Sequence, residues 1–502
     1  MDTPVERCIA CEELELARVR DQPPIQSLPI PNAAMAGFPE GRESGMLTRR
    51  RLLQAGVAGF AAVYGPKLLG FESVWEAAVA EGSVQPTNQL VVLYLAGGND
   101  GLNTLVPSAP ADYTTYQTKR PVLYRGQGPT SGGRVGSQPL TGAANGQLAW
   151  ANVGVSSSGG GDNGSSSFGF DKLYGPGDGT AGSDLAIMPA VDYLPPNLSH
   201  FESSDYWFAG ALHGMTTGWL GRWLDRNGSQ TNPLQAISID TALSKSIRTQ
   251  SAPVCAINSL NSLGFTMSPS GGYGLPSNVS NPLNANSALD GLSGVTVGAD
   301  NVHLARSRNT FGSAVNVYNT THNLPAFTPP SNYPSSSLST KLKLAAHLLA
   351  NNLGTRVVTI HWGAFDTHGG QLAGQDPQLS TLSLALGAFQ ADLAARGIAQ
   401  NVATLVFSEF GRRVDENASG GTDHGAGGLM MLAGAPVKGG WAAQFPGLAS
   451  TPQGNLQVPT DFRDVYGQIL AEWLGDDPTA ILAGKSSYGL GTRPDGQTGL
   501  FK

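Results

Sequence analysis

The sequence predicts an α/β protein with a mostly parallel central sheet and helices on both faces. Continuous apolar runs of strand length alternate with segments in which apolar residues recur every three or four positions. Strand–helix–strand order of this kind is typical of parallel strands joined by covering helices. Long stretches rich in glycine, serine and asparagine interrupt the alternation. We therefore expect a single α/β domain, residues 85–502, with two large loop insertions.

The first half of the domain contains two predicted strands and one helix. Residues 90–95 form a continuous apolar run, as in strands that are covered on both faces. Residues 126–183 lack periodicity and are the first expected insertion. The second strand spans 184–191, a helix follows over 199–212, and the polar stretch 265–335 is the second insertion.

Regular alternation returns in the second half. Apolar residues mark one face of a helix that ends at Gly354. A second helix with an apolar face ends at Gly397. The apolar positions are Leu338, Leu342, Ala345, Leu349 and Leu353 in the first helix, and Leu379, Leu382, Leu386, Phe389 and Leu393 in the second. Strands are expected over 356–362 and 401–407, and a late helix over 462–474.

Residues 46–80 have the order of a secretory signal. Thr48-Arg49-Arg50-Arg51-Leu52-Leu53-Gln54 precedes a weakly apolar stretch, 55–64, and Ala78-Val79-Ala80 offers a cleavage site. Paired arginines are typical of the twin-arginine variant. The apolar stretch is too short for a stable membrane span. We expect the twin-arginine translocase to export the chain to the periplasm, the cell surface or the medium; the alternative is a basic cap on a buried helix.

The lead segment, residues 1–45, has eight acidic and four basic residues, which is unusual before an export signal, so translation starts at either Met1 or Met46. Its Cys8 and Cys11 form a lone C-x-x-C pair, which is a weak zinc or redox signal. Cys255 is the only cysteine after the predicted cleavage site, so the mature chain has no internal disulfide.

Composition and missing motifs exclude several function classes. The net charge is −7, which argues against nucleic acid or an anionic membrane surface as a partner. Charged residues make up 13% of the chain, against roughly 25% in typical proteins. Neither G-x-x-x-x-G-K-[ST] nor G-x-G-x-x-G accompanies a strand–helix pair, and G-x-S-x-G is absent, so nucleotide-binding and serine-hydrolase motifs are missing.

Polar residues follow the first two predicted strands at the edge where ligands of open α/β sheets bind. Asn99-Asp100 comes after the first strand, where a plain turn is the alternative. Ser199-His200-Phe201-Glu202 comes after the second and matches the S-x-x-E capping box. Ser199 is therefore expected as a helix cap or as a nucleophile at the helix N-terminus, and the two roles are not exclusive.

Acidic and histidine side chains follow the later strands. Asp366 and His368 lie two residues apart in an extended segment, so both side chains point the same way. Glu409 ends a strand, and Asp423-His424 lies in the glycine-rich loop after it. The alternatives are a simple Asp–His hydrogen bond and a turn with an incidental histidine. Together these side chains suit a divalent metal better than an organic cofactor.

Several longer motifs resemble an exported bacterial family, domain of unknown function 1501, whose members usually bear a twin-arginine signal. The resemblance runs from about residue 90 to 474. It rests on Leu95-Ala96-Gly97-Gly98-Asn99-Asp100-Gly101-Leu102-Asn103, Ser199-His200-Phe201, Gly218-Trp219-Leu220-Gly221-Arg222, Phe365-Asp366-Thr367-His368-Gly369, Phe407-Ser408-Glu409-Phe410-Gly411-Arg412 and Gly421-Thr422-Asp423-His424-Gly425. The family looks like a branch of the alkaline phosphatase and sulfatase superfamily, which implies an alkaline-phosphatase-like fold.

The resemblance implies a metal site with a covalent nucleophile. The metal ligands that it implies are Asp100 after the first strand, Asp366 and His368 on one metal, Glu409 on the other, and His424 with Asp423 completing the set. Ser199 would be the nucleophile. Arg222 or Arg412 would hold the ester. The chain departs from the superfamily in two ways: a strand ends in Glu409, and His424 is the last histidine. One metal, or none, is therefore an alternative to two.

The sequence thus predicts a metal-dependent hydrolase of phosphate or sulfate esters that acts outside the cytoplasm. Its expected cofactor is one or two divalent ions (zinc, manganese or calcium), and its expected substrate is an anionic small-molecule or glycan ester. The short motif of the sulfatase nucleophile, an oxidised cysteine or serine, is missing, which argues against sulfate hydrolysis by that nucleophile. The alternatives are a non-catalytic exported protein that binds a glycan or protein partner, and an accessory protein of a neighbouring exported system.

Overall fold

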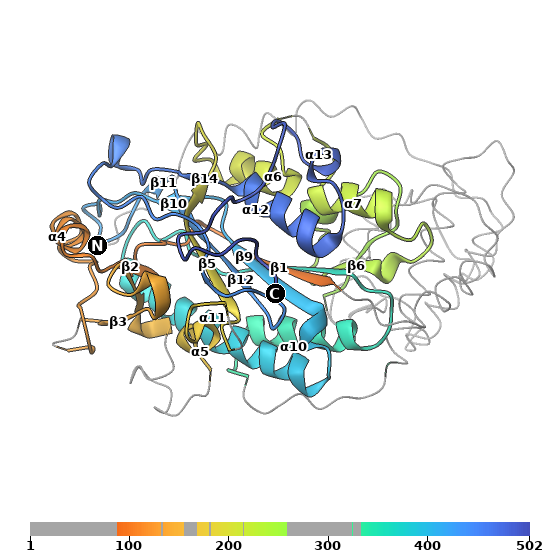
Figure 1. Ribbon diagram of the computed structural model, residues 1–502, viewed down its shortest axis with the longest axis horizontal. Coiled ribbons are helices and arrows are strands. Elements are labelled where there is room, and N and C mark those ends of the chain that lie inside the picture. Colours follow the sequence, from red (N-terminus) through yellow and green to blue (C-terminus); the bar gives the residue numbers. More distant parts are fainter. Residues whose placement is uncertain are drawn as a thin grey trace, which may run out of the picture. The chain divides into compact units, whose positions relative to one another are not determined.

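The computed structural model describes residues 88–131, 134–154, 168–179, 182–213, 215–258, 324 and 333–502. All of them belong to the larger of two compact units, Gly59–Phe265 with Leu275–Lys502. The predicted lead segment, the export signal and nearly all of 265–335 lie outside the described residues. Figure 1 shows the helices and strands of the described part.

The described part is a mixed α/β structure around a large sheet. Its strand order is β13-β5-β12-β9-β1-β8-β6-β7, and β14 also pairs with β5. The strands are β1 Gln89–Leu95, β5 Leu185–Asp192, β6 Ala236–Ser238, β7 Cys255–Ala256, β8 Val357–Trp362, β9 Val402–Phe407, β12 Gly428–Ala433, β13 Gly440–Trp441 and β14 Thr460–Asp461.

The centre of this sheet is parallel. Strand β1 pairs parallel with β8 and with β9, so that Leu95 lies opposite Trp362 and Tyr94 opposite Phe407. The three strands therefore end at one edge. Strand β12 runs antiparallel to both β5 and β9. It was not among the strands expected from the sequence.

Helices cover both faces of the sheet (Figure 1). Alternate residues of β1 divide between the faces, because successive side chains of a strand point to opposite sides. Val91 and Leu93 pack in one core with α10 Ser337–Ala350 and α11 Gln371–Ala395. Leu90 and Val92 pack in the other core. The helices of that second core are α6 His200–Ala209, α7 Trp219–Asn227 and α12 Phe462–Ile469.

Two helices differ from the expected bounds. Helix α11 begins at Gln371, eight residues before the first periodic leucine, and accommodates Pro377 near its N-terminus. The late helix is α-helical only to Ile469, and Leu470–Leu474 form a π-helical turn that ends at Gly475. A left-handed glycine, here with φ of 70°, is a common helix terminator.

The first of the two expected loop insertions is not confirmed. Within its described residues, β3 Ser137–Pro139 and β4 Leu148–Ala151 form a small sheet with β2 Leu105–Pro107, and α5 Phe170–Tyr174 packs nearby. Trp150 is 2% exposed and stacks on Phe170, which is 1% exposed. Periodicity missed these elements because each is only three to five residues long. The remaining helices are α4 Pro110–Lys119 and α13 Pro478–Ile481.

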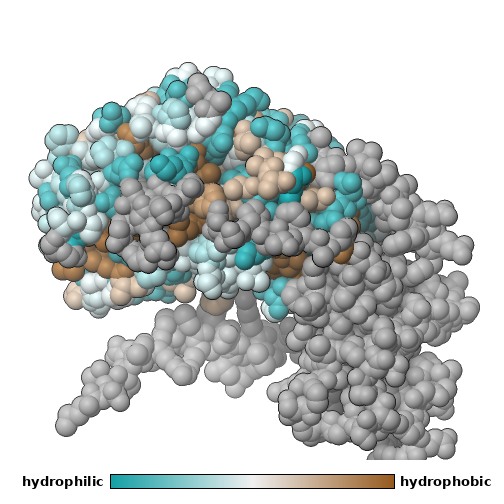
Figure 2. Space-filling model, turned by 90° about the horizontal axis from the view of Figure 1, so that it is seen from below, coloured by the Kyte–Doolittle hydropathy of each residue, from teal (hydrophilic) through white to brown (hydrophobic). Residues whose placement is uncertain are grey.

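The surface is mixed in polarity. Figure 2 shows one face of the molecule, on which teal and white residues are interspersed with smaller brown areas. Among the described residues, none of the helices is long and apolar enough to cross a membrane.

Candidate metal centre

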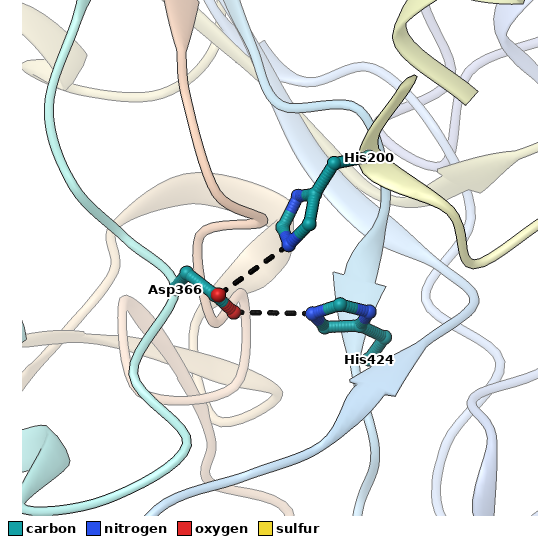
Figure 3. A group of neighbouring side chains, drawn as sticks. All are labelled: His200, Asp366 and His424. Carbon is teal, nitrogen blue, oxygen red and sulfur yellow. Dashed lines mark hydrogen bonds and ion pairs between the residues drawn. The ribbon is translucent and has the colours of Figure 1, made fainter. Parts of the chain in front are cut away.

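Two imidazoles converge on one carboxylate beyond the ends of the central strands (Figure 3). His200 is the first residue of α6, Asp366 follows β8, and His424 begins β11 His424–Gly425. The Nε2 atom of His200 lies 3.4 Å from Oδ2 of Asp366, and Nε2 of His424 lies 3.1 Å from Oδ1. One ligand atom from each of the three residues lies within 4.8 Å of the others.

A third imidazole borders this group. The Nε2 atom of His368 lies 3.1 Å from Oδ1 of Asp366 and 2.9 Å from Nε2 of His424. Asp366 and His368 thus point the same way, as their spacing predicts. His368 is 46% exposed, like Asp366, so the cluster is open to solvent.

Each imidazole is held on its Nδ1 side by an acceptor outside the cluster. These contacts are His200 to Glu409 Oε1 at 2.7 Å, His424 to the Leu198 carbonyl at 2.9 Å, and His368 to Asp423 Oδ1 at 3.2 Å. A carbonyl or an ionised carboxylate only accepts hydrogen bonds. The proton of each ring therefore lies on Nδ1, and Nε2 is left facing Asp366. Metal-binding histidines have this arrangement, because the outer acceptor fixes the tautomer and the ring orientation.

The spacing of the inner atoms fits a bound cation. Two ligands on a tetrahedral zinc with bonds of about 2.05 Å lie roughly 3.3 Å apart. The His424 pair with Oδ1 of Asp366 and the His200 pair with its Oδ2 are separated by 3.1 and 3.4 Å. When the rings of His368 and His424 are neutral and protonated on Nδ1, their facing Nε2 atoms present two lone pairs to each other. A cation between the rings and the carboxylate removes that repulsion.

Charges within the cluster stabilise one another. Partial burial alone would raise the pKa of Asp366, but hydrogen bonds from His200, His424 and Arg412 hold it well below its ordinary value. Burial lowers the pKa of His200, but hydrogen bonds and charges of Asp366 and Glu409 outweigh it and raise that pKa to about 9. The cluster therefore favours positive charge around one ionised carboxylate.

Glu409 lies behind the cluster and is 1% exposed. Its carboxylate accepts hydrogen bonds from the backbone of Gly97 at 2.9 Å and of Gly98 at 3.2 Å. A Cβ on Gly97 would lie 2.4 Å from the nitrogen of Asp366, and φ is +109° there, so only glycine fits. The glycine-rich turn after β1 thus binds Glu409, which in turn orients His200. Glu409 contacts this cluster through His200, and its carboxylate is not one of the converging groups.

Asp423 also lies outside the converging group. Its side chain is 53% exposed and contacts Nδ1 of His368. Hydrogen bonds from Asn417 and His368, with the nearby charge of Arg413, lower the pKa of Asp423 against a modest effect of burial. Asp423 is placed to orient His368.

Asp100 is not brought into the cluster. It is 1% exposed and forms an ion pair of 2.5 Å with the fully buried Arg120. Its other contacts are the Gln371 amide and the backbone nitrogens of Leu102 and Asn103. With both oxygens committed to protein donors, the expected role of Asp100 as a ligand is corrected to a buried structural pair.

Backbone carbonyls hold both predicted arginines. Arg412 has a fully buried side chain, and each guanidinium nitrogen donates to the protein, including one bond of 2.8 Å to Asp366. The expected role of Arg412 on the ester is therefore corrected to a structural one. Arg222 donates one bond from each guanidinium nitrogen to the carbonyls of Thr217, Ala209 and Ile481. Since a guanidinium has five donors, its expected role on the ester stays a prediction.

Ser199 is the N-cap of α6, but its hydroxyl does not cap the helix. Glu202, the other half of the expected capping box, instead accepts from the Asn197 amide. The capping-box interpretation is therefore wrong. Ser199 lies between Leu198 and His200, which both contact the cluster. Within the described residues, its hydroxyl makes no hydrogen bond of its own.

Two residues of the site were not predicted from the sequence. No role was predicted for His200 itself, although an imidazole directly after a strand and a turn indicates a possible metal ligand. Arg413 is exposed, its backbone nitrogen donates to the Asp423 carbonyl, and its charge acts on the Asp423 carboxylate. No sequence pattern distinguished it from Arg412.

An α/β fold with a histidine–carboxylate cluster beyond the ends of its central strands defines a class of candidate metalloproteins. Residues 320–486 match the family model described as "Protein of unknown function (DUF1501)". Over this stretch the match confirms the resemblance that the motifs indicate. None of the curated proteins matches the chain.

Solved structures give a weak likeness. Alkaline phosphatase from the Antarctic bacterium TAB5 is 9% identical, covers 70% of this chain and 91% of its own, and has a TM-score of 0.26. Two variants of that enzyme, described with Mg bound in the M3 site, cover the same shares at 9% identity, with TM-scores of 0.26 and 0.27. Scores of this size carry no argument about the site.

Proposed function

We propose that this chain is an exported metal-dependent hydrolase of phosphate or sulfate esters, built on one alkaline-phosphatase-like domain. The observation that carries this proposal is the convergence of His200, Asp366 and His424 with Nε2 atoms aimed at one carboxylate. The cluster is open to solvent, since the Asp366 side chain is 46% exposed. A purely structural ion pair gains little from such exposure.

These three residues would hold one divalent ion. Two of the three ligands are imidazole nitrogens, which suit zinc better than calcium, an ion that takes oxygen ligands. A metal bound there would act as a Lewis acid on an ester oxygen and lower the pKa of a hydroxyl or water. Glu409 and the Leu198 carbonyl would keep the two rings in the binding tautomer.

Ser199 is the proposed nucleophile. The residues on either side of it both touch the cluster, and its hydroxyl is not used as a helix cap. Its oxygen would bond to the phosphorus or sulfur as the ester oxygen leaves, and water would later release the acid. His368, held by Asp423 at 3.2 Å, would carry protons between the site and solvent.

Residues 46–80 are proposed to direct export through the twin-arginine translocase. Replacing Arg49 and Arg50 by lysine should retain the protein in the cytoplasm of a bacterial host, because that pathway reads the arginine pair. Cell fractionation measures the outcome. Unchanged export of the double variant would contradict this part of the proposal alone.

The test of the enzymatic proposal combines metal analysis with turnover. Protein purified without chelator should contain about one divalent ion per chain and hydrolyse generic aryl phosphates or sulfates. Ser199→Ala should keep the metal and lose at least ~1000-fold in kcat. Ser204→Ala, whose hydroxyl contacts only the Phe201 carbonyl on the same helix, is the matched control. Protein without metal and without turnover would favour the non-catalytic binding alternative.

A further inference from the structure

A groove of about 480 Å³ lies next to the candidate metal centre. Its apolar lining consists of Leu194, Pro196, Ala426, Pro452, Leu456, Val458 and Pro459. This volume lies within the usual range of small-molecule sites, roughly 300–1000 Å³. Leu194 is 61% exposed, which is high for a large apolar side chain. The groove therefore offers accessible apolar surface to a ligand.

The walls of the groove continue from the backbone that carries His424. Ala426 lies two residues after His424, and its nitrogen donates to the Asn455 side chain at 3.1 Å. Pro196, which also lines the groove, lies two residues before Leu198, whose carbonyl holds the His424 ring. Short segments thus connect two parts of the lining to the centre, and a molecule with its reacting group at the centre would extend along them into the groove.

The charges are divided between the centre and the groove. None of the residues that line the groove is ionisable, and its polar members are the amides Gln453, Asn455 and Gln457. The exposed Arg413 lies between the two regions. Its Cδ is 3.8 Å from the position that a Cβ on Gly454 would occupy, beside the groove, and its charge acts on Asp423 at the centre. An anionic group fits the centre and an uncharged group fits the groove.

We infer that this groove binds the uncharged, aliphatic part of the substrate, so that the enzyme acts on monoesters whose organic group carries no second charge. The inference rests on the proposed function. A second anionic group in the groove would lose its water without meeting a cation among the lining residues. None of the lining residues is aromatic, so stacking on a sugar or base is not what the groove offers.

The experiment compares ethyl and hexyl monoesters, as phosphates and as sulfates, with hexane-1,6-bisphosphate as the doubly charged analogue. Metal-loaded wild-type protein should show kcat/KM at least ~10-fold higher for the hexyl than for the ethyl ester, because four more methylenes are buried. The kcat/KM for the bisphosphate should be no higher than that for the ethyl ester. The head group that is turned over identifies the ester class.

Two variants of the exposed Gln457 test the groove itself. Gln457→Trp should fill the groove and lower the ratio of the hexyl to the ethyl kcat/KM at least fivefold. Gln457→Lys should raise the kcat/KM for the bisphosphate relative to that for the hexyl ester. Gln400→Trp is the matched control, since Gln400 is exposed and lies just before β9, at the opposite end of the strands. It should keep the wild-type ratio.

The outcomes separate the two proposals. Turnover with equal kcat/KM for both chain lengths, or a ratio that Gln457→Trp leaves unchanged, overturns the groove inference and leaves the hydrolase intact. Metal-loaded protein that turns over none of the esters overturns the proposed function, and the groove inference with it.

Discussion

The Nε2 atoms of His368 and His424, 56 positions apart in the chain, lie 2.9 Å from each other. Both rings are held on the Nδ1 side by acceptors, Asp423 and the Leu198 carbonyl. In neutral rings both facing atoms are therefore unprotonated, and either protonation or a bound cation relieves the repulsion between their lone pairs. A metal also satisfies Asp366, which lies 3.1 Å from each of these nitrogens.

Removing a metal-binding imidazole should release the metal. His200→Ala or His424→Ala should weaken zinc affinity at least ~100-fold, because each removes one of three first-sphere donors. Competition with a fluorescent chelator measures the affinity. His213→Ala is the control, because His213 is exposed and lies outside the cluster. Equal affinity of all three variants would contradict the site.

Glu409→Gln should weaken metal binding and the fold together. The glutamine amide would face backbone donors of Gly97 and Gly98 or the His200 Nδ1 proton, where an acceptor is required. We expect a loss of ~10–100-fold in metal affinity and ~1–3 kcal/mol in the free energy of unfolding. Urea unfolding and chelator competition measure the two losses. Glu202→Gln, at an exposed position, should change neither.

Asp100→Asn should destabilise the fold and leave the metal in place. It breaks the buried pair with Arg120 and leaves that cation unbalanced, at a cost of ~3–5 kcal/mol. Metal content per folded chain should stay at the wild-type value. Asp415→Asn removes the neighbouring surface pair with Lys119, in which Asp415 is 47% exposed, and should cost at most ~1 kcal/mol. Metal loss in the Asp100 variant would restore that residue as a ligand.

Asp192→Asn should change how stability depends on pH. Burial raises the pKa of Asp192 to about 7, against hydrogen bonds from Gly427 and Tyr193, and the charge of Asp461 adds to the rise. The unfolded carboxyl ionises above about pH 4 and the folded one only near 7. Wild-type stability therefore falls as pH rises between these values and levels off above.

The variant lacks this carboxyl, so its stability relative to wild type should rise between pH 5 and pH 8. Only the two units between pH 5 and the folded pKa of about 7 contribute, and at ~1.4 kcal/mol per unit they limit the relative gain to about 3 kcal/mol. Urea unfolding of both proteins at the two pH values measures it. A constant difference between them would show that Asp192 is already ionised in the fold at pH 5.

The sequence by itself determined the central strands and the helices with long apolar faces. Strand β1 is a continuous apolar run, and α10 carries leucines at helical spacing, because burial on two faces or one stripe leaves a local pattern. Asp366 with His368 was predictable for the same reason, since an extended segment sets their directions within three residues.

Only the tertiary structure decided which polar residues meet. His200 joins Asp366 across 166 positions of chain, a relation that no local spacing encodes. Asp100 and Arg412 carry suitable chemistry, yet buried partners use their oxygens and nitrogens. A side chain's role depends on which donors and acceptors remain unpaired after folding, and these are fixed by long-range contacts.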